Sequence, residues 1–184
     1  MAKKIYQFKV TLHGIRPPIW RRFQVYDNLT FYEFHHVIQT VMMGWHGGHL
    51  HSFDVGGLQI TDAETLSMGW GDGEDENNAR LNQYVLHEKQ KLRYEYDFGD
   101  GWEHQLLLEK ILPVEADTHY PRCLKGKRNC PPEDCGGVWG YATMLEALAD
   151  KNHSEHKMYA EWVGDDFDAE EFDLEWINEL LEEM

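Results

Sequence analysis

The sequence contains no apolar run that approaches the roughly 20 residues of a membrane-spanning helix. It also lacks internal repeats, low-complexity linkers and several well-known enzyme motifs: the Walker A phosphate loop, GxGxxG, GxSxG, HExxH and the zinc-finger spacings. These absences argue against a helical membrane protein, a P-loop or Rossmann nucleotide enzyme, an α/β-hydrolase and a zincin protease.

Cysteine is scarce, with three residues in a chain of 184, and an odd number does not suit a disulfide framework. The opening residues MAKKIYQFKV run directly into a strand-like pattern, without the apolar core and the cleavage site of a signal peptide. Unpaired thiols fit a reducing compartment. We therefore expect a cytoplasmic protein without membrane association.

Positive charge is also scarce: the chain has 17 Lys and Arg residues and 33 Asp and Glu residues, which gives a net charge of −16. Residues 1–60 carry six cations against three anions, whereas residues 155–184 carry one against twelve. An acidic chain gains little from phosphate electrostatics, so a nucleic-acid partner is disfavoured. The basic N-terminal third leaves a local patch at Arg16, Arg21 and Arg22 as a weaker alternative.

The chain has enough apolar material for a hydrophobic core. Apolar residues make up 42% of it and aromatic residues 13%, which is typical of a globular domain and not of a disordered chain. A chain of this length can bury a core without disulfide or metal cross-links. We therefore expect a single domain over residues 1–184.

Periodic patterns place two strands before one long helix. Period-two alternation predicts strands at 5–12 and 19–25, paired as a hairpin. Thr30 and Glu33 have the spacing of a capping box, and the apolar residues that follow predict a helix ending near Gly44.

The later elements follow in a different order from a parallel doubly wound sheet. Strands are predicted at 50–55, 91–97 and 102–112, with 58–60 as a continuation; loops at 61–80 and 113–139; and helices at 141–149, from 154 onwards and at 174–181. The chain thus divides into a sheet with one helix (1–112), a Cys-, Pro- and Gly-rich loop region (113–139) and C-terminal helices (140–184). This order predicts an α+β fold with a mixed, mostly antiparallel sheet and a β-grasp- or roll-like ββαβ start.

The first candidate site is the cysteine cluster Cys123, Cys130 and Cys135. Thiolates bind zinc tetrahedrally, a histidine could supply the fourth ligand, and nearby Lys and Arg residues would favour the thiolate form. The alternative is that these are reduced cysteines in a packed loop, because their spacing is not that of a CxxC knuckle.

The second candidate is the histidine group His46, His49 and His51. On a strand, His49 and His51 would lie on one face, where imidazoles can bind a metal ion or transfer protons. The alternative is a solvated strand face, with His46 near the C-terminal end of the helix dipole. His35 and His36 are interpreted as structural.

The third candidate is the segment from Asp97 to His104, where Asp97, Asp100, Glu103 and His104 could act as ligands. Its Asp-Gly pair favours the alternative, a hairpin turn with aromatic cross-strand packing. The acidic tail lacks the ligand spacing of an EF-hand and is interpreted as a solvated face. Its acids are Asp165, Asp166, Asp168, Glu170, Glu171 and Asp173, and its aromatics Phe167, Phe172 and Trp176 are expected to dock it on the core.

Together these segments resemble the plasmid Ri open-reading-frame-three-like family over nearly the whole chain. The resemblance is carried by Ile15-Arg16-Pro17-Pro18-Ile19-Trp20-Arg21-Arg22, the helix ending in Gly44-Trp45, His49-Leu50-His51-Ser52-Phe53, Tyr96-Asp97-Phe98-Gly99-Asp100-Gly101-Trp102-Glu103-His104, Pro121-Arg122-Cys123 and Cys130-Pro131-Pro132-Glu133-Asp134-Cys135-Gly136-Gly137. It implies an α+β fold and an occurrence on plasmids, chromosomes and insertion elements, some members being passenger proteins. It implies no catalytic residue.

We therefore predict a binding or accessory module, associated with plasmids or mobile elements, whose segments 46–54, 96–104 and 121–137 form one surface. A protein partner suits such a module. The first alternative is a metal-dependent hydrolytic enzyme with a zinc-type ion, and the second is a nucleic-acid-binding accessory protein. The predicted surface residues are Trp45, Asp97, Asp100, Trp102, Glu103, Glu133 and Asp134, and the candidate metal ligands are Cys123, Cys130, Cys135, His46, His49, His51 and His104.

Overall fold

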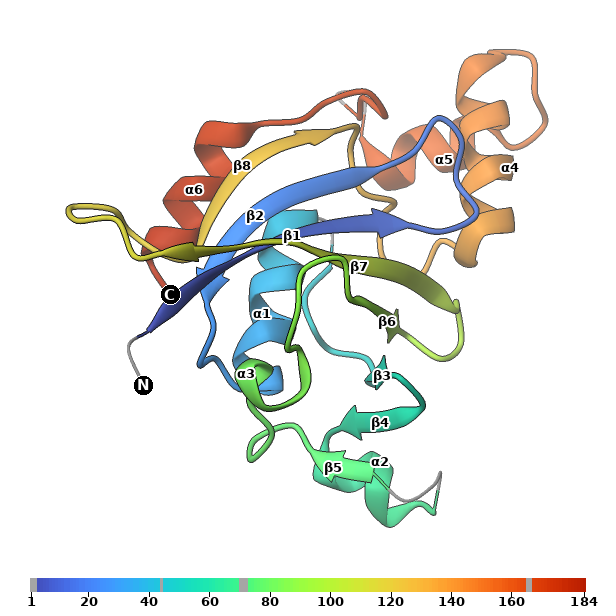
Figure 1. The fold of residues 1–184 in the computed structure, drawn as a ribbon. Helices are drawn as coiled ribbons and strands as arrows, with labels where there is room; N and C mark the ends of the chain where they lie inside the picture. The colour runs from blue at the N-terminus through green and yellow to red at the C-terminus, as the bar shows by residue number, and fades with distance from the viewer. Residues whose placement is uncertain (1–2, 44, 70–72, 165–166) are drawn as a thin grey trace.

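The computed structural model describes residues 3–43, 45–69, 73–164 and 167–184. Within them lies an eight-stranded sheet with the order β5-β4-β3-β6-β7-β1-β2-β8 (Figure 1). Neighbouring strands are antiparallel, except that β4 and β5 are parallel. The strands are β1 (Lys4–Leu12), β2 (Trp20–Tyr26), β3 (His51–Val55), β4 (Leu58–Thr61), β5 (Gly73–Asp75), β6 (Lys91–Tyr96), β7 (Trp102–Pro113) and β8 (Arg122–Lys127). The helices are α1 (Phe31–Met42), α2 (Ala63–Ser67), α3 (Leu81–Tyr84), α4 (Gly137–Ala149), α5 (His156–Val163) and α6 (Leu174–Glu182). The predicted α+β class, with a mostly antiparallel sheet and C-terminal helices, is confirmed.

The core lies between the sheet and α1, which covers one of its faces (Figure 1). Phe8 of β1 packs on Phe34 of α1 with ring centroids 4.9 Å apart. The predicted capping box is present: the Glu33 amide donates to the Thr30 hydroxyl at 3.1 Å, and the Thr30 amide donates to the Glu33 carboxylate at 2.7 Å. After α1 the chain turns at Met43, whose φ of 58° lies in the left-handed region. The predicted helix end at Gly44 lies outside the described residues.

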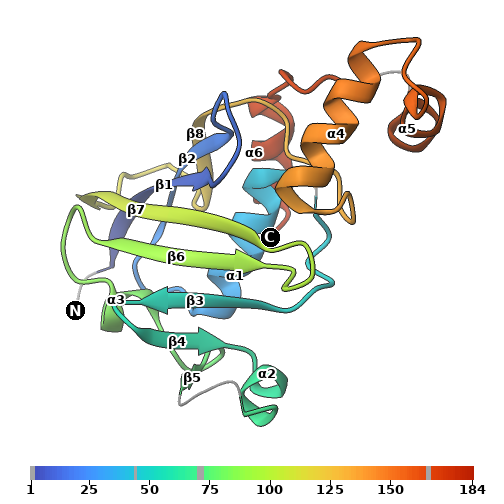
Figure 2. The ribbon, with the colours of Figure 1, turned by 90° about the vertical axis from the view of Figure 1, so that its right-hand side faces the viewer.

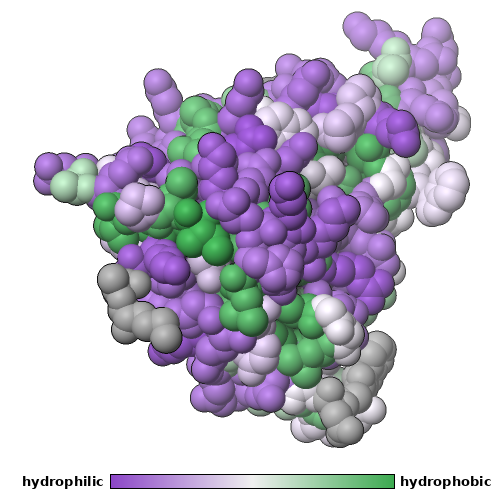
Figure 3. Space-filling view, viewed as in Figure 1, coloured by the Kyte–Doolittle hydropathy of each residue, from purple (hydrophilic) through white to green (hydrophobic). Residues whose placement is uncertain are grey.

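The other face of the sheet is open and mostly hydrophilic (Figure 3). Lys9, Arg22 and Lys125 lie side by side across β1, β2 and β8 on this face. Arg22 forms an ion pair with Glu109 at 2.6 Å. Arg21, the preceding residue, points to the opposite face and is only 1% exposed, so it contributes nothing to a surface patch for nucleic acid.

Two loop predictions were wrong. Residues 61–80 contain α2 and β5, and residues 113–139 contain β8 and the start of α4. Both strands lie at the edges of the sheet and form through pairing with distant partners, β4 and β2, so local alternation did not reveal them. In this respect tertiary pairing overrides the turn signals of these segments.

The C-terminal helices form two groups. Figure 2 shows α4 and α5 extending away from the sheet, whereas α6 packs along α1 and β8. In α6, Ile177 and Leu181 are buried, and Phe172 packs on the core as predicted. Trp176 is 49% exposed, so its predicted docking on the core is wrong, because the inward stripe of α6 runs through Ile177 and Leu181. No helix in the described part of the chain is long and apolar enough to cross a membrane.

Candidate functional site

The three motif segments meet in space at one end of the central strands. The His46 amide donates to the Glu133 carboxylate at 3.1 Å, and the Gly136 amide donates to the Asp100 carboxylate at 3.1 Å. The Tyr96 hydroxyl donates to the other oxygen of Glu133. These bonds tie the loop after α1, the end of β6 and the β6–β7 turn to the segment from Glu133 to Gly136.

Tight turns with unusual backbone geometry hold these segments together. Asp97 and Asp134 have positive φ angles of 55° and 57°, in the left-handed region that Asp and Asn tolerate better than most residues. A Cβ atom at Gly137 would lie 2.3 Å from the Asp100 carbonyl oxygen, so only glycine permits this approach of the two loops. The Gly-Gly pair at the start of α4 therefore brings residues 133 and 134 against the β6–β7 turn.

At this junction, His49 lies among three carboxylates. Its Nδ1 is 3.8 Å from Asp97 Oδ2, and its Nε2 is 3.4 Å from Asp134 Oδ1 and 3.8 Å from Glu133 Oε1. Among the described residues, His49, Asp97 and Asp134 are the set of three donors that all lie within 4.8 Å of one another, a group that could hold a metal ion. We call these three residues the His49 cluster.

The donor types of the His49 cluster suit a divalent transition metal. An imidazole beside carboxylates fits Zn²⁺ or Mn²⁺ better than Ca²⁺ or Mg²⁺, which prefer oxygen ligands alone. Tetrahedral ligands about 2.1 Å from zinc lie about 3.4 Å apart. The separation of His49 Nε2 from Asp134 equals this distance, whereas the set as a whole extends to 4.8 Å, so its side chains would close on a bound ion. The side chain of His49 is 36% exposed and that of Asp134 is 74% exposed, so an ion could enter from solvent.

Beneath the His49 cluster lies a floor of buried aromatic rings. Trp45 stacks on Tyr96 with ring centroids 5.1 Å apart and forms a T-shaped pair with His104, also at 5.1 Å. Trp102 is fully buried, so it supports the predicted surface from below. Burial lowers the pKa of His104 to about 3, which keeps its imidazole neutral. His104 therefore lies below the surface and apart from the three donors.

His51 has a different environment from His49, because β3 begins at His51 and His49 precedes it. Its Nε2 lies 2.7 Å from the buried carboxylate of Glu76, and its ring stacks on His35 at 3.6 Å. The burial of Glu76 gave no signal in the sequence, because the residue lies in a segment rich in glycine and acid. Within the described residues, His51 and His46 are outside the set of close donors.

The three cysteines are buried free thiols. Burial raises the pKa of Cys123 to about 11 and that of Cys135 to about 12, and it also raises the pKa of Cys130. The thiolates expected from the nearby Lys and Arg residues are thus disfavoured. In the described part of the chain, none of the cysteines belongs to a set of three close metal donors.

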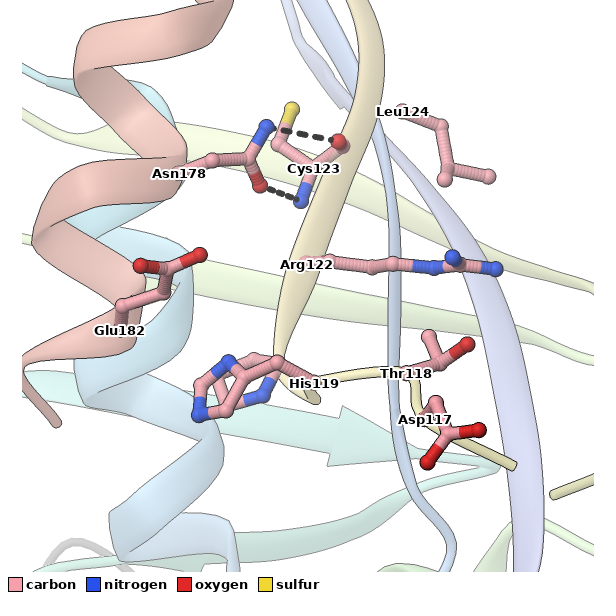
Figure 4. A pocket seen from close by; sticks show the side chains of 9 residues that line it. Asp117, Thr118, His119, Arg122, Cys123, Leu124, Asn178 and Glu182 are labelled. Carbon is pink, nitrogen blue, oxygen red and sulfur yellow. Dashed lines mark hydrogen bonds between the residues drawn. The ribbon is translucent and has the colours of Figure 1, made fainter. Parts of the chain in front are cut away.

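A separate pocket of about 400 Å³ lies between β8 and α6 (Figure 4). Figure 4 shows Asn178 facing Cys123: its side chain accepts from the Cys123 amide at 2.8 Å and donates to the Cys123 carbonyl at 3.1 Å. The amide of Asn178 thus satisfies backbone groups of the edge strand. None of the three donors of the His49 cluster lines this pocket.

Comparison with known proteins identifies the same family as the sequence motifs. Residues 4–176 match the family described as plasmid pRiA4b ORF-3-like protein. The chain is 36% identical to the uncharacterised protein y4hQ of Sinorhizobium fredii (strain NBRC 101917 / NGR234), in an alignment that covers all of this chain and 94% of the relative. It is also similar to the crystal structure of MM3350, a protein of unknown function from Methanosarcina mazei Go1, with 42% identity and a TM-score of 0.84 over 95% of this chain and 97% of the other. The chain therefore belongs to the plasmid pRiA4b ORF-3-like family.

Proposed function

We propose that this protein is a small accessory module that binds a zinc-type divalent ion at His49, Asp97 and Asp134. The observation that carries the proposal is the convergence of these donors, which come from three separate segments, to within 4.8 Å of one another. Glu133 lies 3.8 Å from His49 and is oriented by the Tyr96 hydroxyl and the His46 amide. Such outer hydrogen bonds are how proteins orient carboxylates around metal ions.

The competing explanation is a proton in place of the ion. An imidazolium at His49 would pair with the same carboxylates and would compensate their charge without any metal. The two explanations predict different metal contents after dialysis against a metal salt. A metal site takes up one ion per chain and keeps it through gel filtration, whereas an ion pair takes up none.

The test is metal content by elemental mass spectrometry after untagged protein is loaded separately with zinc and with manganese. We expect close to one ion per chain in the wild type and a clearly lower metal content in His49→Ala and Asp134→Asn, because the loss of a ligand weakens binding at least about tenfold. His87→Ala is the matched control, because His87 is an exposed histidine outside the cluster. Cys130→Ser should also keep the ion. Equal metal content in wild type and His49→Ala would refute the proposal.

A metal-dependent hydrolase is the second candidate, and the exposure of the cluster favours it. A zinc ion held by three protein donors would have room for a water ligand, and the exposed side chain of Asp134 leaves that side open to substrate. Zinc-loaded protein should then hydrolyse an activated ester or phosphoester such as p-nitrophenyl phosphate, and Asp134→Asn should not. Stoichiometric zinc binding without any turnover would argue against the hydrolase and favour the binding module.

We also propose a cytoplasmic location. The three free thiols support it, since unpaired cysteines suit a reducing compartment. Fractionation of cells that express the protein with its natural N-terminus tests it, and recovery in a secreted or envelope fraction would contradict it.

A further inference from the structure

Three neighbouring hollows surround Met43, at the end of α1. They have volumes of about 270, 610 and 360 Å³, and Met43 lines all three of them. The second and third also share His46, and the first and third share Asn129. Because they share lining residues, the hollows lie next to one another, and we refer to them together as the groove. Its lining comes from α1, α5, α6 and the segments beside them.

The walls of this groove combine polar residues with large, exposed apolar side chains. Trp162 of α5 is 47% exposed, Trp176 of α6 is 49% exposed and Met184 is 58% exposed. Thioether side chains such as Met43 and Met184 adapt to partners of different shape. Exposed tryptophans beside a concave surface are typical of protein-binding sites.

The charge of the groove is negative. Glu133, Glu171 and Asp173 line it, and Arg21 is the cation among the lining residues. Arg21 is only 1% exposed and donates to main-chain carbonyls, so it offers no charge to a partner. In the sequence, residues 155–184 carry twelve acids against a single lysine. These charges favour a ligand that is basic as well as apolar.

We propose that the groove is a docking site for a basic amphipathic segment of a protein partner. A large apolar side chain of that segment packs between Met43, Trp162 and Trp176. Its Lys or Arg side chains meet Glu171, Asp173 and Glu133, and the negative field of the C-terminal third speeds its approach. The proposal is independent of the metal ion, although Glu133 belongs to both surfaces.

The probe is a fluorescein-labelled 14-residue peptide with leucine at helical spacing and lysine elsewhere, titrated with the protein in EDTA while fluorescence anisotropy is followed. Its counterpart carries glutamate in place of lysine. We expect saturable binding of the lysine peptide that weakens between 50 and 300 mM salt, and no binding of the glutamate peptide. The chelator separates this result from the proposed metal site.

The variants locate the binding surface. Trp162→Ala with Trp176→Ala should weaken binding about tenfold, as removal of interface anchors does. Trp139→Ala is the control, because Trp139 is 85% exposed on α4 and outside the groove. Glu171→Lys should weaken binding more than Glu179→Lys does.

Circular dichroism melting curves establish that each variant is folded, as expected for exposed positions. The proposal is overturned if the lysine peptide does not bind, if the glutamate peptide binds as tightly, or if Trp139→Ala weakens binding as much as the groove variants do.

Discussion

Arg21 is a buried cation between α1, β2 and β8, and its replacement by methionine is expected to be strongly destabilising. Its guanidinium donates to the carbonyl oxygens of Val41 at 2.8 Å and Met42 at 3.2 Å, which belong to the last turn of α1. It also donates to the Lys127 carbonyl at 3.0 Å, and the Phe172 ring lies 4.8 Å from its central carbon atom. One side chain thus connects the end of the helix to the edge of the sheet.

The size of the effect follows from these contacts. Carbonyls in the last helical turn have no partner within the helix, so removal of the guanidinium leaves them buried and unsatisfied. Each such group costs about 1–3 kcal/mol, and a cation at a helix C-terminus contributes up to about 2 kcal/mol. Methionine keeps the apolar packing of the stem. We therefore expect Arg21→Met to lower the free energy of unfolding by about 3–5 kcal/mol.

Urea denaturation followed by circular dichroism and tryptophan fluorescence measures this difference. Arg22→Met is the matched control, because Arg22 is the next residue, is 32% exposed and pairs with Glu109 on the open face. Its loss should cost about 1 kcal/mol or less. The free energy of unfolding of Arg21→Lys should lie between those of wild type and Arg21→Met, since an ammonium group cannot reach all of the carbonyls. A cost below about 1 kcal/mol for Arg21→Met, or equal costs at the two positions, would refute the reasoning.

Three further changes test other parts of the structure. Asn178→Leu should lower the free energy of unfolding by about 1–3 kcal/mol, measured by urea denaturation, because backbone groups of β8 lose their partners. Gly140→Ala should lower the melting temperature and the metal affinity, because its Cβ would lie 1.8 Å from a backbone oxygen, whereas Gly48→Ala has open space and should change neither. Burial lowers the pKa of His104 from 6.5 to about 3, so between these pH values the unfolded chain binds a proton here that the folded protein does not. The contribution of His104 to the free energy of unfolding should therefore be constant above about pH 6.5 and fall by about 1.4 kcal/mol per pH unit below it. Urea midpoints from pH 7 to pH 4 should show a smaller slope in His104→Phe, and an unchanged slope would contradict this assignment.

Much of the fold could be predicted from local patterns. The alternation in β1 and β2, the capping box of α1 and the Asp-Gly turn between β6 and β7 all appear in the structure. These features depend on neighbours within a few residues, so the chain specifies them locally. The edge strands β5 and β8 were missed, because each forms only when a distant strand supplies its hydrogen bonds.

The candidate site shows the same division. The sequence singled out His49, Asp97, Glu133 and Asp134 as separate motif residues, but alternation placed His49 with His51 on one strand face. In the structure β3 starts at His51, so His51 is buried against Glu76 and His49 is left in the preceding loop.

By itself the sequence determined the class of fold, the family, the uneven acidic charge and which segments contain chemically active residues. The tertiary structure decided which of those residues meet. Asp134 follows His49 by 85 positions and comes within 3.4 Å of it. No local pattern encodes such a contact, because it depends on the order of strands in the sheet and on two glycine-permitted loops that pack against each other.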